Sequence, residues 1–218
     1  MATVLEQLDL EIEKKSLLNH PFYHMWSAGQ LTLDHIRGYT KEYFHLVEAV
    51  PGFVKNIYNL TNSSFLQHEL SQNIKEESDH IELWRKFAGS LGISEQALVE
   101  NIPASKTREA VSSLDSLTKK SLAEAASAMY GYEKELPKIS SSKIRGLKEY
   151  YGMDGNDSTR YFEVHQEADV RHAGLWVRIL KHIPPSKDSV LLEAEAQSLD
   201  AQNYLLDSIY EKYVGCNS

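Results

Sequence analysis

Apolar residues recur every three or four positions along most of this chain, which is the spacing of amphipathic helices. The first such segment contains Leu5, Leu8 and Ile12, and the second begins after Thr32, a residue suited to cap a helix. Pro51 lies inside the second segment and predicts a kink or a break there. The same spacing predicts further helices over 64–91, from Ser94 onward for a short stretch, and over 106–115, 118–135, 141–151, 158–182 and 187–213.

Residues that favour turns are scarce. The chain has 11 glycines and 6 prolines, too few for an all-β protein with many turns. Pro137, Gly152 and the Pro184-Pro185 pair mark breaks between helices, and no repeat or linker divides the chain. We therefore expect an all-α fold, a single-domain bundle over residues 1–218 with about seven to nine helices.

Composition and charge exclude several classes of protein. Lys and Arg number 23 against 31 Asp and Glu, a net charge of -8 that argues against nucleic acid or an anionic membrane as partner. No apolar run approaches the roughly 18 residues of a membrane span, and the acidic N-terminus does not resemble a signal peptide. The single cysteine, Cys216, provides neither a disulfide framework nor a cysteine metal cluster. We expect a cytoplasmic location.

The most informative segment is the run from His165 to His172. His165, Asp169 and His172 are spaced i, i+4 and i+7, so the three side chains project from one face of a helix. Two imidazoles and a carboxylate on one face can form half of a metal site. A solvated polar face with two incidental histidines would show the same spacing.

Two other predicted helices supply matching groups. Glu77 and His80 form the Glu-x-x-His pattern of helical-bundle di-metal proteins, with Glu76 as the competing carboxylate four residues before His80. Glu133 follows the weakly polar run 123–129. Taken alone, an acidic residue beside a core stripe is usually an exposed edge charge, but here it completes a set of six.

Three carboxylates that face one another would repel unless a cation lies between them. Two divalent cations supply four positive charges against the three negative ones, and a shell of carboxylates and imidazoles suits iron or manganese. The candidate ligands are Glu77, His80, Glu133, His165, Asp169 and His172.

At these residues the chain resembles a known family. It is similar to the heme-oxygenase-like di-metal oxidases, and among them to the p-aminobenzoate synthases of the type of the chlamydial protein associating with death domains. That family is related to the pyrroloquinoline-quinone biosynthesis protein C and to thiaminase II. The matching stretches are His20-Pro21-Phe22-Tyr23, Tyr39 to Tyr43, Asn73 to Trp84, Tyr132-Glu133, Lys143 to Leu147 and Tyr161 to His172.

The resemblance implies a bundle of about seven core helices around a di-metal site, and an enzyme that supplies 4-aminobenzoate for folate biosynthesis. It implies a single-turnover oxygenase that uses dioxygen and a reductant, and iron or manganese or a mixture of the two. By motif, Tyr23 matches the tyrosine whose ring becomes the product. Tyr39 matches a nearby redox-active tyrosine, with Tyr132 as a further candidate, and Lys143 matches the amino donor. The six residues above match the metal ligands.

In the family the gap between the glutamate and the histidine of the second ligand helix is longer than the gap between Glu77 and His80. A bulge in this helix would let Glu76 replace Glu77. Two other functions stay open: a di-metal oxygenase acting on an external amino acid or fatty acid, and a non-catalytic protein that binds a partner through a helical surface. Homo-oligomers are expected by analogy with the fold alone.

Overall fold

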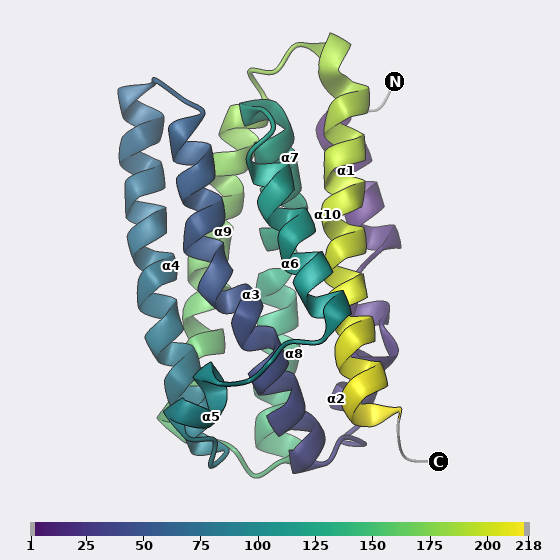
Figure 1. Ribbon diagram of the computed structural model, residues 1–218. Helices are drawn as coiled ribbons and strands as arrows, with labels where there is room; N and C mark the ends of the chain where they lie inside the picture. The colour runs from purple at the N-terminus through teal and green to yellow at the C-terminus, as the bar shows by residue number, and fades with distance from the viewer. Residues whose placement is uncertain (1–2, 216–218) are drawn as a thin grey trace.

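The computed structural model describes residues 3–215 and consists of helices and their connections within that range (Figure 1). Single turns of 3-10 helix precede α2 and α10, and a π-helical turn follows α10. The all-α prediction is confirmed. The α-helices are α1 (Val4–Lys14), α2 (Pro21–Ser27), α3 (Leu33–Asn59), α4 (Ser64–Ser90), α5 (Glu95–Val99), α6 (Ser105–Thr118), α7 (Leu122–Glu133), α8 (Leu136–Tyr150), α9 (Asn156–Leu180) and α10 (Asp188–Ile209).

Two local expectations need correction. Helix α3 continues through Pro51, so the predicted break is wrong there, and the buried side chains of Val50, Phe53 and Val54 hold the helix on both sides of the proline. The periodicity also gave no sign of α2, which has only seven residues. It begins at Pro21, whose fixed φ suits a first helical position, and His20 caps it through the amide of Phe22.

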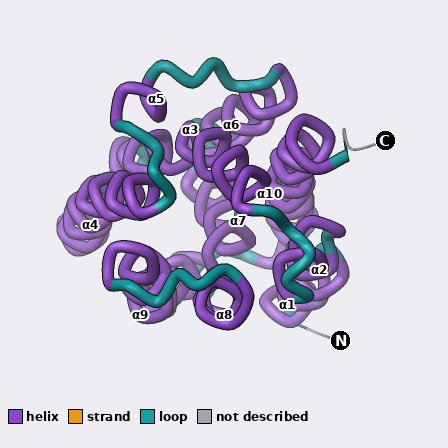
Figure 2. The backbone as a smooth tube through the Cα atoms, turned by 90° about the horizontal axis from the view of Figure 1, so that it is seen from below, coloured by secondary structure: helices purple, strands orange, loops and turns teal. Residues whose placement is uncertain are grey.

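Helix α7 lies in the middle of the bundle, as the end-on view in Figure 2 shows. It contacts α10, α9 and α6, and every residue from Ala125 to Glu133 is buried. Small residues such as Ala126 and Gly131 allow the neighbouring helices to approach this closely, since a helix buried on all sides needs narrow contacts. The end of α7 therefore places Glu133 inside the molecule.

Helices α4 and α9 pack against each other and run in opposite directions (Figure 1). Helix α3 covers α4, and α8 lies along α9. Trp26, Trp84 and Trp176 are all fully buried and belong to the main hydrophobic cluster. The candidate ligands on α4 and α9 thus face the interior between two layers of helices.

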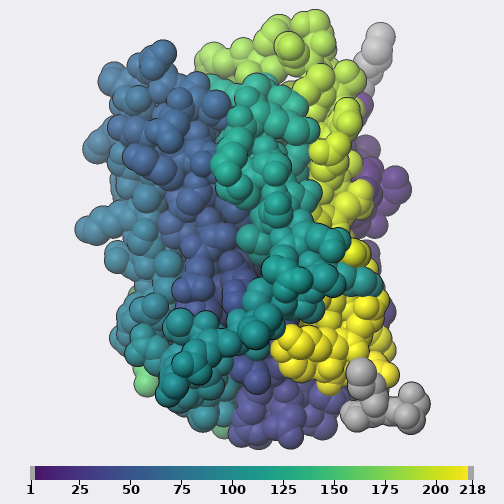
Figure 3. Space-filling model, in the orientation of Figure 1, coloured from purple at the N-terminus to yellow at the C-terminus, as the bar shows by residue number. Residues whose placement is uncertain are grey.

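On the face shown in Figure 3, helices α3, α4, α6 and α10 form the surface, and the segment between α5 and α6 crosses over α3. Asn101 in this segment donates a hydrogen bond to the carbonyl of Lys41, and the amide of Ala104 donates to Glu42. Within residues 3–215, no helix combines the length and the apolar character needed to cross a bilayer. Cys216 lies outside the described residues.

Candidate metal centre

The two predicted ligand helices face each other. On α9, His165, Asp169 and His172 are all buried, and on α4 so are Glu77 and His80. The carboxylate of Glu77 joins the two helices, because Oε1 lies 3.3 Å from Nδ1 of His172 and Oε2 lies 3.3 Å from Nδ1 of His80. The rings of His80 and His165 pack with centroids 4.3 Å apart.

These contacts form two groups of three candidate ligands that share Glu77. In each group the ligand atoms lie within 4.8 Å of one another, and all five side chains are buried. The first group offers two imidazoles and a carboxylate, and the second offers one imidazole and two carboxylates. The groups are Glu77, His80 and His165, and Glu77, Asp169 and His172.

Glu133 approaches the same region from the end of α7. Its Oε2 accepts a hydrogen bond from Nε1 of Trp176, while Oε1 has no hydrogen-bond partner among the described residues. Oδ2 of Asp169 is also buried and equally unpaired within residues 3–215. Buried carboxylate oxygens normally have partners, so these two fit a site whose missing partner is a cation.

Three neighbouring buried carboxyl groups have pKa values shifted in different directions. Burial, followed by the charge of Glu77, raises the pKa of Glu133 to about 8. Burial and the charges of Glu133 and Glu77 raise the pKa of Asp169 well above its usual range. For Glu77, burial acts in the same direction, but hydrogen bonds to His172 and His80 outweigh it and hold the pKa well below its usual range.

The imidazoles of His165 and His172 have pKa values shifted in opposite directions. Burial and the nearby charge of His80 lower the pKa of His165 to about 3, so this ring is neutral and its nitrogens suit a metal ion. Its Nδ1 lies 2.6 Å from the carbonyl oxygen of Tyr161, an arrangement that leaves Nε2 available to a metal ion. Burial acts to lower the pKa of His172, but its bond to Glu77 and the neighbouring carboxylates raise that pKa to about 10.

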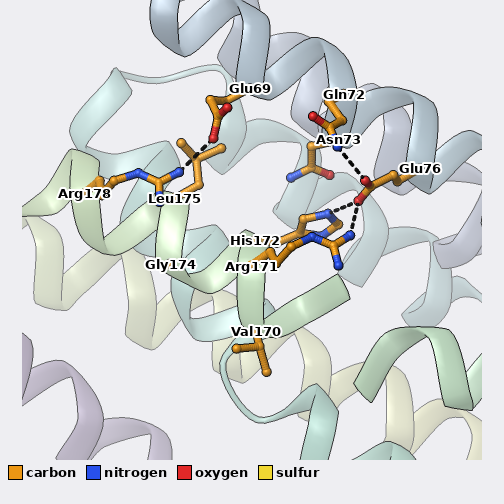
Figure 4. Close-up of a pocket in the computed structure, with 10 residues that line it drawn as sticks. All are labelled: Glu69, Gln72, Asn73, Glu76, Val170, Arg171, His172, Gly174, Leu175 and Arg178. Carbon is orange, nitrogen blue, oxygen red and sulfur yellow. Dashed lines mark hydrogen bonds and ion pairs between the residues drawn. The ribbon is translucent and has the colours of Figure 1, made fainter. Parts of the chain in front are cut away.

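Glu76 and Glu77 take different positions. Helix α4 is continuous over this stretch, without the bulge that would turn Glu76 inward, and Glu77 is the buried member of the pair. Figure 4 shows Glu76 held by Gln72 on its own helix and by Arg171 and His172 on α9. Because Glu76 lies 2.9 Å from Nε2 of His172, it orients this ring while Nδ1 faces Glu77.

A second cluster surrounds Lys143 of α8. Its ammonium group donates a hydrogen bond to the hydroxyl of Tyr39 and lies 5.4 Å from the ring centroid of Tyr23 and 5.0 Å from that of Tyr43. The side chain is 3% exposed, and burial lowers the pKa of Lys143 to about 7. A substantial share of the amine is therefore neutral near pH 7.

The candidate tyrosines lie in this aromatic environment. Tyr23 and Tyr39 are buried, and burial raises the pKa of each hydroxyl well above its usual range. Phe22 stacks on Tyr39 with ring centroids 5.1 Å apart. Tyr132 is also buried, and the charges of Glu77 and of Asp169 add to the effect of burial in raising its pKa. All three rings are protected from bulk water.

Residues that the sequence did not single out connect the two clusters. The ring centroid of Tyr161 lies 4.2 Å from that of His165 and 4.6 Å from that of Trp84. The ring centroid of Trp84 in turn lies 5.8 Å from that of Tyr39. Trp176 is the hydrogen-bond donor to Glu133. The helical period could have found two of them, because Tyr161 and Trp176 are spaced four residues before His165 and four after His172.

The chain matches a family of proteins described as iron-containing redox enzymes over residues 37–201. It is 33% identical over 218 residues to a 4-aminobenzoate synthase from Chlamydia muridarum, covering 98% of this chain and 92% of that protein. It is also 33% identical over 227 residues to a 4-aminobenzoate synthase from Nitrosomonas europaea, covering 97% of this chain and 92% of that protein.

Solved structures share the arrangement of helices. A TenA homologue from Pseudomonas syringae superposes with a TM-score of 0.83 at 16% identity and covers 96% of this chain and 93% of its own. A CADD-like protein of unknown function from Nostoc punctiforme superposes with a TM-score of 0.77 at 19% identity and covers 97% of both chains. At these identities the likeness concerns the fold alone.

Proposed function

Because this chain belongs to the family of iron-containing redox enzymes, we propose that it forms 4-aminobenzoate, with dioxygen as oxidant and an external reductant. One observation carries the proposal furthest. A partly neutral amine, Lys143, is buried against the rings of Tyr23 and Tyr39, and the aromatic contacts of Trp84 and Tyr161 connect this cluster to the candidate ligands.

Two divalent cations, iron or manganese, would be held by the two groups that share Glu77, with Glu133 beside them. Bound there, the cations supply the one-electron chemistry that dioxygen needs to react with closed-shell organic groups. The unpaired oxygens of Glu133 and Asp169 support this assignment. Glu76 and Trp176 orient two of the ligands through hydrogen bonds.

The protein's own residues supply the carbon and nitrogen atoms of the product in this proposal. In 4-aminobenzoate the carboxylate is para to the amine, as Cβ of a tyrosine is para to its hydroxyl. The ring and Cβ of Tyr23 therefore become the product, with cleavage of its Cα–Cβ bond. Cβ is oxidised to the carboxylate with oxygen from dioxygen, and a glycine is left at position 23. Nζ of Lys143 bonds to the ring carbon that carried the hydroxyl, the hydroxyl oxygen leaves as water, and the Nζ–Cε bond breaks to leave an aldehyde at Cε. The sum balances with two dioxygen molecules, two electrons from the reductant and two protons consumed, and two water molecules formed. Each chain then completes one turnover.

Tyr39 has a positioning and proton-holding role. Its hydroxyl accepts a hydrogen bond from Nζ of Lys143, which fixes the amine next to Tyr23. The buried rings of Phe22, Tyr39 and Trp26 exclude water from this part of the bundle. A neutral amine is the nucleophilic form, so exclusion of water from Lys143 favours bond formation.

Isotope labelling tests this function directly. Protein labelled with ¹⁵N at lysine and ¹³C in tyrosine rings is loaded with iron or manganese and exposed to oxygen and ascorbate. We expect doubly labelled 4-aminobenzoate and a matching loss of mass from the chain, mapped to Tyr23 and Lys143. Tyr23→Phe abolishes the product, whereas the control Tyr58→Phe, a ring packed under Lys55, retains it.

Wild-type amounts of product from Tyr23→Phe would reject Tyr23 as the source of the ring. An unmodified chain that turns over repeatedly when an amino acid or fatty acid is added would instead identify an oxygenase with an external substrate. Unlabelled nitrogen in the product would reject Lys143 as donor while leaving the tyrosine assignment intact.

A further inference from the structure

Asn73 on α4 is buried in a way that costs the protein free energy. Its side chain is 2% exposed, and neither the amide oxygen nor the amide nitrogen has a hydrogen-bond partner among the described residues. An amide removed from water without a replacement partner destabilises a fold, and buried amides are normally paired. The described residues therefore leave both polar atoms of the Asn73 side chain without a hydrogen bond.

The position of Asn73 on the helix points to that partner. Asn73, Glu77 and His80 are spaced i, i+4 and i+7, and each is buried. This is the spacing of the ligand triad on α9, and the two helices are antiparallel, so the triads oppose each other in reverse order. Asn73 is one turn beyond Glu77 in the direction away from His80, and so falls on the side of Glu77 where His172 lies.

The cavity between α4 and α9 places the same residues together. It has a volume of about 370 Å³, and the residues that line it include Asn73, His172, Glu76 and Arg171. Figure 4 shows the Asn73 amide inside this cavity, next to the ring of His172 on the facing helix. The amide therefore lies beside His172, a member of the candidate ligand group that also contains Glu77 and Asp169.

We propose that Asn73 is a further, neutral ligand: its amide oxygen coordinates the divalent cation held by Glu77, Asp169 and His172. Amide carbonyl oxygens are ordinary ligands of hard divalent cations such as manganese. A neutral donor also suits this position, because Glu77, Asp169 and Glu133 already bring three carboxylates to the site. A fourth carboxylate would add repulsion, whereas an amide adds an oxygen without charge.

Asn203 on α10 provides the contrast within the same chain. Its amide nitrogen donates to the carbonyl oxygens of Lys15 and Leu199, at 3.0 Å each. This asparagine stabilises the fold by its own hydrogen bonds, whereas Asn73 has none to lose. The same substitution at the two positions therefore separates a structural amide from a ligand.

The experiment measures Mn²⁺ binding by electron paramagnetic resonance titration, and the melting temperature of the metal-free protein, for wild type, Asn73→Leu and Asn203→Leu. Asn73→Leu should weaken the affinity of one Mn²⁺ site by about tenfold or more. It should leave the metal-free melting temperature unchanged or higher, because a leucine removes an unpaired polar group. Asn203→Leu should lower the melting temperature and leave Mn²⁺ affinity unchanged.

A second variant tests the proposal if Asn73→Leu does not fold. Asn73→Asp keeps an oxygen at the same position and adds a charge, so the increase in melting temperature on Mn²⁺ addition should exceed that of wild type. Wild-type Mn²⁺ affinity in Asn73→Leu, or a lower metal-free melting temperature in that variant, would overturn the proposal. The inference rests on the metal site of the proposed function, and absence of Mn²⁺ binding by wild type would reject that site itself.

Discussion

At the scale of single residues, Lys143 shows how burial sets a chemical role. Its amine is surrounded by the rings of Tyr23, Tyr39, Tyr43 and Phe162, and this burial lowers its pKa to about 7. An unfolded lysine stays charged up to an ordinary value of 10.5. The folded state therefore binds fewer protons between these two values, and this residue makes the fold less stable at low pH than at high pH.

The lowered pKa of Lys143 determines how the reaction should depend on pH. Only the neutral amine of Lys143 can form a bond to carbon, so the rate of 4-aminobenzoate formation should rise with pH and level off above about pH 7. Single-turnover product formation by metal-loaded protein, followed by chromatography across a pH series, measures this. Lys143→Gln should give no product at any pH, and the control Lys138→Gln, exposed on the same helix, should follow the wild-type curve. A rate that falls as pH rises through 7 would contradict the assigned role.

The residues of the site differ in how far the sequence predicted them. His165, Asp169 and His172 follow from the helical period alone, because one helix brings them together. The contact between Lys143 and Tyr39 joins positions 104 residues apart, and no local pattern encodes it. Only the family resemblance singled out these two residues. Asn73 shares the helical spacing of Glu77 and His80, but its neutral amide lacks the charge or the imidazole by which metal ligands are recognised in a sequence.

At the scale of helices, the packing of α7 against α10 depends on a glycine, which has no side chain. A Cβ at Gly131 would lie 2.7 Å from Cγ of Glu195, a fully buried residue of α10. The carboxyl of Glu195 has no hydrogen-bond partner within residues 3–215, and burial raises its pKa to about 9, so it is neutral at pH 7. The close packing of α7 against α10 in turn fixes the position of Glu133, two residues after Gly131.

Gly131→Ala should therefore destabilise the protein, although alanine is favoured over glycine in helices by about 1 kcal/mol. Overpacking of a core costs about 1–3 kcal/mol, so the melting temperature should fall by a few degrees. The control Gly52→Ala in α3, where a Cβ meets nothing within 4 Å, should raise it. Glu195→Ala should relieve the clash, so the double variant should be more stable than the summed effects of Gly131→Ala and Glu195→Ala predict. Additive effects of the two substitutions would show that Glu195 is not the obstacle.

The helices themselves were predicted where they are long and amphipathic. The third predicted helix, 64–91, matches α4 within one residue, because its apolar face and its end at Gly92 are both visible in the sequence. Pro51 misled the prediction, since local propensity cannot weigh the tertiary contacts that keep α3 intact. Helix α2 is shorter than two periods and becomes a helix through its proline, its cap and the burial of Phe22, Tyr23 and Trp26.

At the scale of the whole molecule, cation binding and protonation are linked. The pKa of Glu133 is raised to about 8, that of Asp169 is raised well above its usual range, and that of His172 is about 10, so Glu133 and His172 hold protons near pH 7 when no cation is bound. A cation that binds these groups must displace the protons. The carboxyl of Glu133 contributes stability to the metal-free fold at low pH and loses that contribution as pH rises through about 8.

Mn²⁺ binding should therefore tighten as pH rises from 6 to 8, and it should release protons. Calorimetric titration in two buffers with different protonation enthalpies measures the release, because the observed heat changes with the buffer in proportion to the protons taken up. Since the cation binds the folded state, it should also raise the melting temperature, by an amount that grows over the same pH range. Chelation should reverse the increase. Heats that are independent of the buffer, with an affinity that is flat across this range, would show that the cation binds elsewhere than at these three groups.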